Sequence, residues 1–213
     1  MLQLSKNIGW IVMTLFALLL CYTTAQYLTF EPNINFLIVK EELIFDAVWR
    51  PTFYIHVISA MIVILVGPFQ FIKNLRNKNL RLHKMLGKIY AYGILAFAAP
   101  TGLIMAFYAE GGQPSTIAFL IMGGLWFYTT IMAIIKVKQK NITEHQKWMY
   151  RSFALSFAAV TLRVLVPLMS LSNSFKEETV IVATAWLSWI LNLIFIEIFI
   201  YYKFRNNHQP IKT

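Results

Sequence analysis

The sequence predicts an all-α membrane protein, a bundle of six transmembrane helices. With 58% hydrophobic residues, 13% charged residues and a mean hydropathy of +0.60, the chain is too apolar for an ordinary soluble domain. Six apolar runs reach the roughly 20 residues that cross a hydrocarbon core about 30 Å thick. Basic residues cluster between them. The runs are 8–27, 53–72, 85–108, 115–135, 148–171 and 180–202. The connections are short, so we expect residues 1–213 to form a single integral membrane domain.

The first run follows Lys6 and ends near Ala25, as the apolar part of a signal peptide does. We expect an uncleaved span, because the run is long and five more follow it. The single cysteine, Cys21, lies inside this run, which excludes a disulfide framework and a Cys-x-x-Cys motif.

The net charge of +10 is explained by topology. Short loops rich in Lys and Arg mark the cytoplasmic side of a membrane protein. With the N-terminus inside, the outer segments carry only Lys40, Arg50 and Lys176. All remaining cations except Arg163 fall in cytoplasmic segments: Lys6, Lys73, Arg76, Lys78, Arg81, Lys84, Lys88, Lys136, Lys138, Lys140, Lys147, Arg151, Lys203, Arg205 and Lys212. We therefore expect a multi-pass protein of the cell membrane with both termini in the cytoplasm, in contact with the lipid bilayer and without a nucleic-acid partner.

The longest outer segment, 28–52, reads as a short helix on the outer membrane surface with Trp49 at headgroup depth. Two interpretations stay open for it. The segment is either a lid over an outer cavity or a plain connector.

The run 144–167 is an apolar helix with one polar stripe. His145, Ser152, Ser156 and Arg163 recur at steps of seven, four and seven residues, which places them on one helix face. Ionisable groups inside a span are candidates for a functional site. The sequence leaves open whether this stripe is functional or structural.

His83 and His145 are the candidate cofactor ligands. Each lies at the cytoplasmic end of a span, and both spans run in the same direction, so the two imidazoles share a depth. A histidine on each of two neighbouring helices is what axial ligation of a b-type haem requires. Gly87, one turn after His83, leaves room for a flat macrocycle or for the close approach of a neighbouring helix. Alternatively, both imidazoles form hydrogen bonds at the interface or hold a metal or another small ligand. We assign no metal site and no catalytic residue.

His56 and Arg163 form a second candidate pair, near the outer side. Arg163 lies about 27 Å along the helix from His145, and His56 on span two has a similar depth. A buried arginine needs a carboxylate, a carbonyl or an anion, so Asp46 or a bound propionate, quinone or anionic substrate is the expected partner. The alternative is an arginine that reaches the outer headgroups.

Two further polar residues lie near the inner face. Glu197 on span six is expected at the level of Arg151, where it either pairs with that arginine or orients a histidine. His208 lies in a polar tail and is expected to be solvated.

The segments 82–90 (LHKMLGKIY), 145–155 (HQKWMYRSFAL) and 161–163 (TLR) resemble a family of bacterial multi-span proteins known only as a domain of unknown function. The resemblance runs from about residue 54 to 167. It implies a membrane location and a fold, and no established activity.

The His83-x-x-x-Gly87 pattern is also similar to the two-haem cytochromes b of the ascorbate-dependent and ferric-reductase type. Those proteins hold two haems with four histidines from four helices. Span four of this chain has no histidine, so the resemblance implies at most one site, through His83 and His145.

The sequence therefore predicts a b-type cytochrome-like membrane redox module, with haem b between His83 and His145 and an outer quinone or anion site at His56 and Arg163. The competing hypothesis is a non-enzymatic transporter of protons or small solutes, or an accessory protein, in which the same polar stripe lines the path. Whether the protein is an enzyme, and its oligomeric state, are left open.

Overall fold

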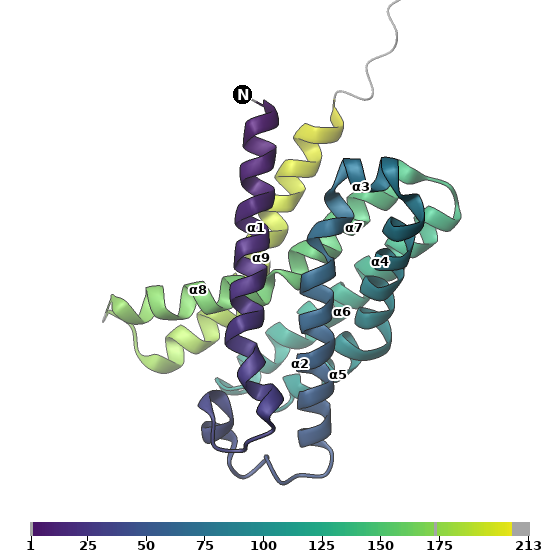
Figure 1. Cartoon of the computed structure of the whole chain (residues 1–213). Helices are drawn as coiled ribbons and strands as arrows, with labels where there is room; N and C mark the ends of the chain where they lie inside the picture. The colour runs from purple at the N-terminus through teal and green to yellow at the C-terminus, as the bar shows by residue number, and fades with distance from the viewer. Residues whose placement is uncertain (1, 173, 206–213) are drawn as a thin grey trace, which may run out of the picture.

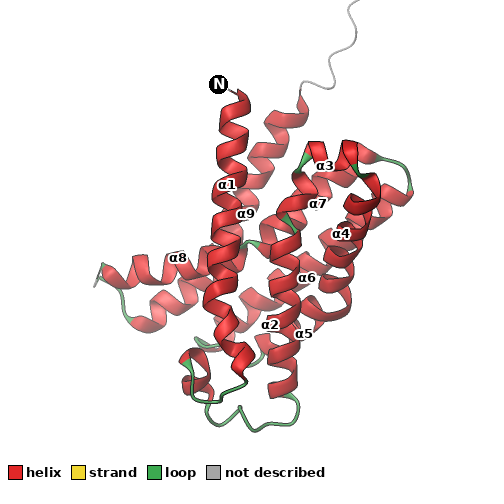
Figure 2. Ribbon diagram, viewed as in Figure 1, coloured by secondary structure: helices red, strands yellow, loops and turns green. Residues whose placement is uncertain are grey.

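The computed structural model describes residues 2–172 and 174–205, and in that part of the chain loops connect helices and there is no strand (Figure 2). Six helical segments within it are long and apolar enough to cross a membrane, which confirms the predicted fold class. They are Gly9–Thr29, Trp49–Phe71, Leu80–Ala106, Gly112–Lys138, Ile142–Leu171 and Glu177–Arg205. The grouping into a single domain stays a prediction, and His208 lies outside the described residues.

The first, second, fourth and sixth segments are built on single long helices. These are α1 (Leu2–Ala25), α2 (Trp49–Val66), α6 (Gly112–Lys138) and α9 (Glu177–Arg205) (Figure 1). Apolar side chains of these helices meet those of the third and fifth segments in one interior cluster. Its most enclosed members include Tyr90 and Ile94, with Trp126, Phe153 and Trp189 around them. This interior positions the polar groups described below.

The third segment changes helix type part-way. It consists of α4 (Leu80–Tyr92), the π-helical η4 (Gly93–Ala98) and α5 (Ala99–Ala106). Pro100 follows the π-helical turns and has no N–H to donate, so the irregular hydrogen bonding falls where the α-helical ladder is interrupted.

The fifth segment is divided at Phe157 into α7 (Ile142–Ser156) and α8 (Ala158–Leu171). Asn192 on α9 joins the two parts. Its amide donates to the Ala154 carbonyl at 3.1 Å and accepts from the Thr161 hydroxyl at 3.0 Å. In Figure 1, α8 and the first turns of α9 extend to the left of the other helices. The stripe expected along one continuous helix is therefore interrupted between Ser156 and Arg163.

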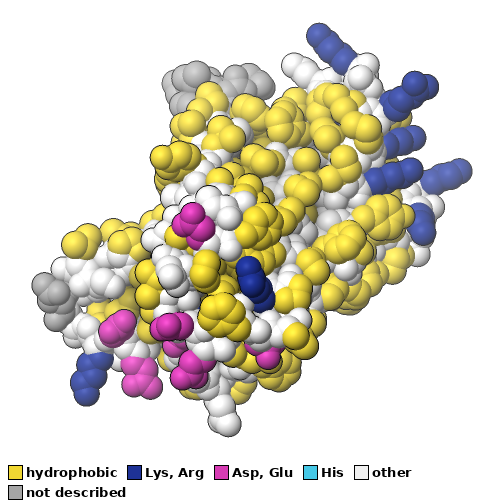
Figure 3. Space-filling model, turned by 60° about the horizontal axis from the view of Figure 1, so that its bottom comes forward, with side chains coloured by type: hydrophobic (Ala, Val, Ile, Leu, Met, Phe, Trp, Pro, Cys, Tyr) yellow, Lys and Arg dark blue, Asp and Glu magenta, His cyan; other side chains and the backbone are white. Residues whose placement is uncertain are grey.

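The two ends of the bundle carry opposite charge. We call the end with α3 (Lys73–Lys78) and the starts of α4 and α7 the basic end, and the opposite end, where α9 begins, the acidic end. Figure 3 shows most Lys and Arg side chains gathered at one end of the molecule and Asp and Glu at the other.

The segment before α2 differs from the expected surface helix. It forms two short 3-10 turns, η1 (Gln26–Thr29) and η2 (Asn35–Lys40). Trp49 is 1% exposed and stacks on Phe53 at a centroid distance of 5.2 Å. This aromatic ring belongs to a second buried cluster under the segment, and the headgroup depth expected for Trp49 stays a prediction.

Candidate functional site

The two candidate ligands, His83 and His145, occupy equivalent positions in two similarly built helix starts. Asn79 caps α4 by accepting the Leu82 N–H at 2.9 Å, and Asn141 caps α7 by accepting the Glu144 N–H at 3.1 Å. Each histidine lies four residues after its capping asparagine. Because of the caps, the helices begin at residues 80 and 142, earlier than the spans expected from 85 and 148, and both imidazoles lie inside helices rather than before them.

His145 is oriented by the neighbouring helix. Its Nδ1 lies 2.8 Å from the Ala133 carbonyl oxygen on α6, which can only accept. Nδ1 therefore carries the proton and donates it, and in the neutral ring Nε2 keeps a free lone pair. Histidines that bind metals or small ligands are commonly held this way.

His83 has no such partner. Its Nδ1 is buried and forms no hydrogen bond with the described residues. The same is true of Nε2 of Gln70, a side chain that is 7% exposed and lies on the 3-10 turn η3 (Pro68–Phe71) after α2. Gln70 contacts the face of α4 that carries His83, because its Oε1 lies 3.1 Å from the position that a Cβ on Gly87 would take.

Arg76 adds positive charge at this level. It lies half-buried on α3, the short helix that leads from η3 into α4. Arg76 makes no ion pair with an acidic residue of the described chain. We call Gln70, Arg76, His83 and His145 the basic-end site.

The space one helical turn beyond the two histidines is filled by η3. Gln70 lies in the notch that Gly87 leaves on α4, and the Phe71 ring packs on α7 against Tyr150 and Phe153 at centroid distances of 5.0 and 5.2 Å. The notch expected to admit a macrocycle is thus occupied by a protein side chain. Among the described residues, this packing leaves no room for a haem beside Gly87, between His83 and His145.

The residues in the middle of the polar stripe on 144–167, Ser152 and Ser156, are part of a buried network of hydroxyl groups. The Tyr90 hydroxyl lies 3.0 Å from both Ser152 Oγ and Ser156 Oγ. The Trp126 indole N–H donates to Ser156 Oγ at 2.9 Å, and Thr130 Oγ1 lies 2.8 Å from Ser152 Oγ. Every side chain of this network has a partner, so these groups join α4, α6 and α7 and leave no atom free for a ligand.

The structure does not bring His56 and Arg163 together. His56 Nδ1 donates to the Ala98 carbonyl at 2.8 Å, within the segment that contains η4 and α5, and the ring packs where Gly102 has no side chain. Arg163 lies on α8, which packs against α9 and α1, and its Nη1 donates to the Ala159 carbonyl at 3.2 Å.

Asp46 is not the partner of Arg163. Its Oδ1 accepts the backbone N–H groups of Val48 and Trp49 at 2.8 and 2.6 Å, which caps the start of α2. These two hydrogen bonds hold the pKa of the Asp46 carboxyl below its usual value.

Comparison with known families agrees with this architecture. A family model described as "Predicted membrane protein (DUF2306)" matches residues 53–200. The chain belongs to this family. The match runs from α2 into α9 and so contains the whole basic-end site, and it confirms the resemblance to an uncharacterised multi-span family. No curated protein and no solved structure matches the chain, and the similarity to two-haem cytochromes b stays a prediction.

The expected ion pair between spans five and six is confirmed. Within the family's matched region, Arg151 on α7 and Glu197 on α9 form a two-pronged pair, with Nε to Oε1 at 2.5 Å and Nη2 to Oε2 at 2.9 Å. Glu197 therefore holds two helices together and does not orient a histidine.

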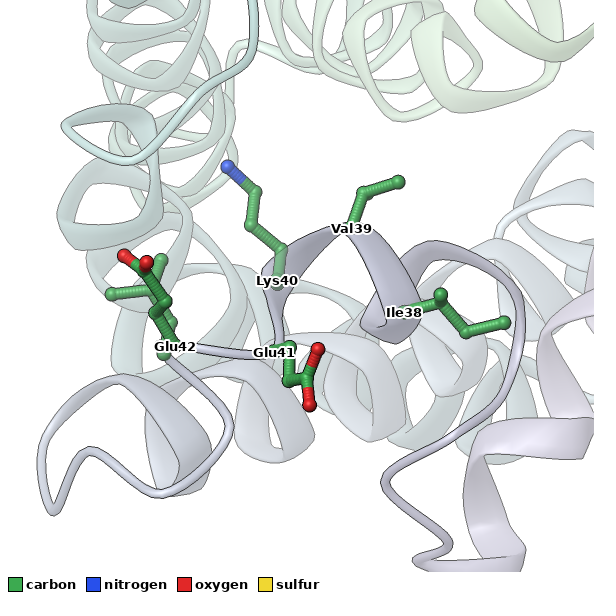
Figure 4. Close-up of a pocket in the computed structure, with 6 residues that line it drawn as sticks. Ile38, Val39, Lys40, Glu41 and Glu42 are labelled. Atoms are coloured by element: carbon green, nitrogen blue, oxygen red, sulfur yellow. The ribbon is translucent and has the colours of Figure 1, made fainter.

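At the acidic end, the segment before α2 is fastened by a lysine. Lys40 is 9% exposed, and its ammonium donates to the Tyr108 carbonyl at 2.7 Å and pairs with Glu110 at 2.5 Å. In the shallow pocket lined by residues 38–43, the Lys40 side chain points away from that of Glu41 (Figure 4). These contacts favour the connector interpretation of the segment over a mobile lid.

Sequence reasoning missed Gln70 and the capping asparagines. Two signals for them were present: an uncharged polar residue near the end of an apolar run, and Asn-x-x-x-His in both 79–83 and 141–145. Among the described residues, no group of three or more His, Cys, Asp or Glu side chains is arranged to hold a metal ion.

Proposed function

We propose that this protein is a non-enzymatic membrane module that binds a small polar ligand at the basic-end site, as a transporter or accessory protein does. One observation carries the proposal. Two buried polar atoms of this site lack partners among the described residues: His83 Nδ1 on α4, and Nε2 of Gln70, whose side chain packs against the same face of α4 at Gly87. Arg76 on the neighbouring α3 has no ion-pair partner there either. A buried donor without an acceptor costs about 1–3 kcal/mol, and a ligand that supplies the acceptor recovers this free energy.

The proposed orientation places this site on the cytoplasmic side of the cell membrane. The distribution of Lys and Arg supports it, because the basic end carries the short, cation-rich connections that remain inside. Both termini then lie in the cytoplasm, and the ligand enters from there or from the inner leaflet.

A membrane redox module with haem b between His83 and His145 is the competing function. The orientation of His145, with Nδ1 bonded to Ala133, favours it. The filled notch at Gly87 disfavours it, because the Gln70 side chain takes the place that the macrocycle would need. A quinone or anion site shared by His56 and Arg163 has no support either, since the two side chains bond to different helices.

Two measurements on the purified protein test the proposal. After expression with ample haem, we expect an absorbance spectrum without a Soret band. In a thermal-unfolding screen with separate panels of inorganic anions, divalent cations, nucleotides and quinones, we expect at least one class to stabilise the wild type but not His83→Ala.

Two results would contradict the proposal. The first is a Soret band that is lost in His83→Ala and in His145→Ala, which would establish the redox module. The second is a screen in which no class of ligand separates the wild type from His83→Ala.

A further inference from the structure

We infer that the basic-end site binds a phosphate group, taken either from the headgroup of an anionic lipid or from a soluble phosphate. This inference rests on the proposed function and names the ligand class of that site. It is carried by the kind of hydrogen-bonding groups that the fold leaves unpaired there.

The unpaired groups can all donate hydrogen bonds. The Gln70 amide nitrogen is a donor only, Arg76 offers up to five N–H groups, and His83 offers one N–H as a neutral ring and two as a cation. The ligand that satisfies such a set consists mainly of acceptors. Phosphate oxygens are strong acceptors, and planar guanidinium groups bind them with two parallel hydrogen bonds.

The charge around the site favours an anion over a neutral carbonyl compound. The nearest acid in the sequence is Glu144, which is already paired with Lys147 at 2.7 Å. Five further cations lie on α3 and α4, which together carry the connection between the second and third spans: Lys73, Lys78, Arg81, Lys84 and Lys88. The field at this end therefore attracts anions to a site that contains no carboxylate of its own.

The burial of Gln70 distinguishes the basic-end site from a surface that attracts anions through its positive charge alone. A lysine-rich loop attracts phosphate without any buried group, but here a side chain with only 7% exposure presents an unsatisfied amide on the same face as His83. Apolar packing at this position would avoid the cost of the unpaired amide. The amide is explained if an acceptor occupies the site in the functioning protein.

The experiment uses the full chain in a maltoside detergent, which contains no phosphate group. In one arm, inorganic phosphate is titrated; in the other, the micelles contain increasing fractions of phosphatidylglycerol. Thermal unfolding and native mass spectrometry report binding. Stabilisation by phosphate alone identifies a soluble ligand, and stabilisation by phosphatidylglycerol alone, with retained lipid in the mass spectrum, identifies a headgroup.

The variants test the named residues. Arg76→Gln and Gln70→Met should each weaken binding about tenfold or more, since each removes a hydrogen bond to a charged group. Lys78→Gln is the matched control: it removes one charge from an exposed position of the same helix and should weaken binding less than threefold.

Gln70→Met should weaken ligand binding but stabilise the protein when no ligand is present. Met has a similar volume and no polar atom to satisfy, so the empty variant should unfold at a higher temperature than the wild type. A purely structural role for the Gln70 amide predicts a lower unfolding temperature instead, and that result would overturn the inference.

Two other results would also overturn the inference. One is equal loss of binding in Lys78→Gln and Arg76→Gln, which would show that only the surface charge attracts the phosphate. The other is no stabilisation in either arm. If another ligand class from the screen still stabilises the wild type and not His83→Ala, the phosphate inference fails and the proposed function stands; if none does, both fail.

Discussion

The hydroxyl network and the basic-end site are two polar regions of one helix bundle, and they differ in how their hydrogen bonds are satisfied. Around Tyr90, every hydroxyl and indole group has a protein partner. Around His83, two buried polar atoms have no partner in the part of the chain that the structure describes. Satisfied polar groups stabilise a fold, whereas unsatisfied ones cost free energy until something else binds them. The first region is therefore expected to control stability and the second to control binding.

The largest effect is expected for Tyr90→Ala. The Tyr90 side chain is fully buried, and its removal leaves a cavity and takes one hydrogen bond from each of two serines, which should cost about 3–5 kcal/mol of unfolding free energy. Denaturant unfolding in a fixed detergent measures this. Tyr92→Ala on the same helix, with a side chain 62% exposed, is the control and should stay within about 0.5 kcal/mol of wild type. Equal costs for the two variants would contradict a stabilising role for the network.

Gly67→Ala should have an intermediate effect. A Cβ at position 67 would lie 2.2 Å from Cε2 of Phe153, so α2 and α7 must move apart or the ring must shift, at about 1–3 kcal/mol. Because this close approach places η3 against α7, the variant should also weaken binding at the basic-end site. Gly124→Ala is the control, since nothing lies within 4 Å of its Cβ. It should be neutral or slightly stabilising, and a loss as large as that of Gly67→Ala would refute the steric explanation.

Asn79→Ala and Asn141→Ala should each cost about 1 kcal/mol through loss of a helix cap. Hydrogen exchange at the Leu82 and Glu144 amides reports each cap separately. Similar losses of stability in the two variants would show that the starts of α4 and α7 are built alike. His83 and His145 would then differ only in their hydrogen-bond partners. A cost confined to one of the helices would count against this equivalence.

The smallest effect concerns Asp46 at the acidic end. Its folded-state pKa lies below the usual 3.8, so its stabilising contribution is present above that value and is lost as the pH falls through the lower folded-state pKa. Asp46→Ala should therefore increase hydrogen exchange at Val48 and Trp49 at neutral pH, with the difference from wild type vanishing in strong acid. Glu42→Ala should show no such pH-dependent difference. A difference for Asp46→Ala that persists in strong acid would contradict the charge-dependent cap.

The sequence was sufficient for the features that depend on composition along the chain. The apolar runs predicted six spans because a helix needs about 20 apolar residues to cross a bilayer, whatever it packs against. The Arg151–Glu197 pair was also predictable, since depth along two helices places the two charges at one level.

Other features were decided by the tertiary structure, because they depend on which helix faces approach each other. Gln70 became part of the candidate site because η3 folds back onto the Gly87 face of α4, a contact that no spacing in the sequence encodes. His56 and Arg163 were expected at similar depths, but the packing gives them different partners: His56 bonds to the Ala98 carbonyl and Arg163 to the Ala159 carbonyl of its own helix. The sequence by itself determined which residues are polar and how deep they lie, and only the packing of the helices decided which of them have partners.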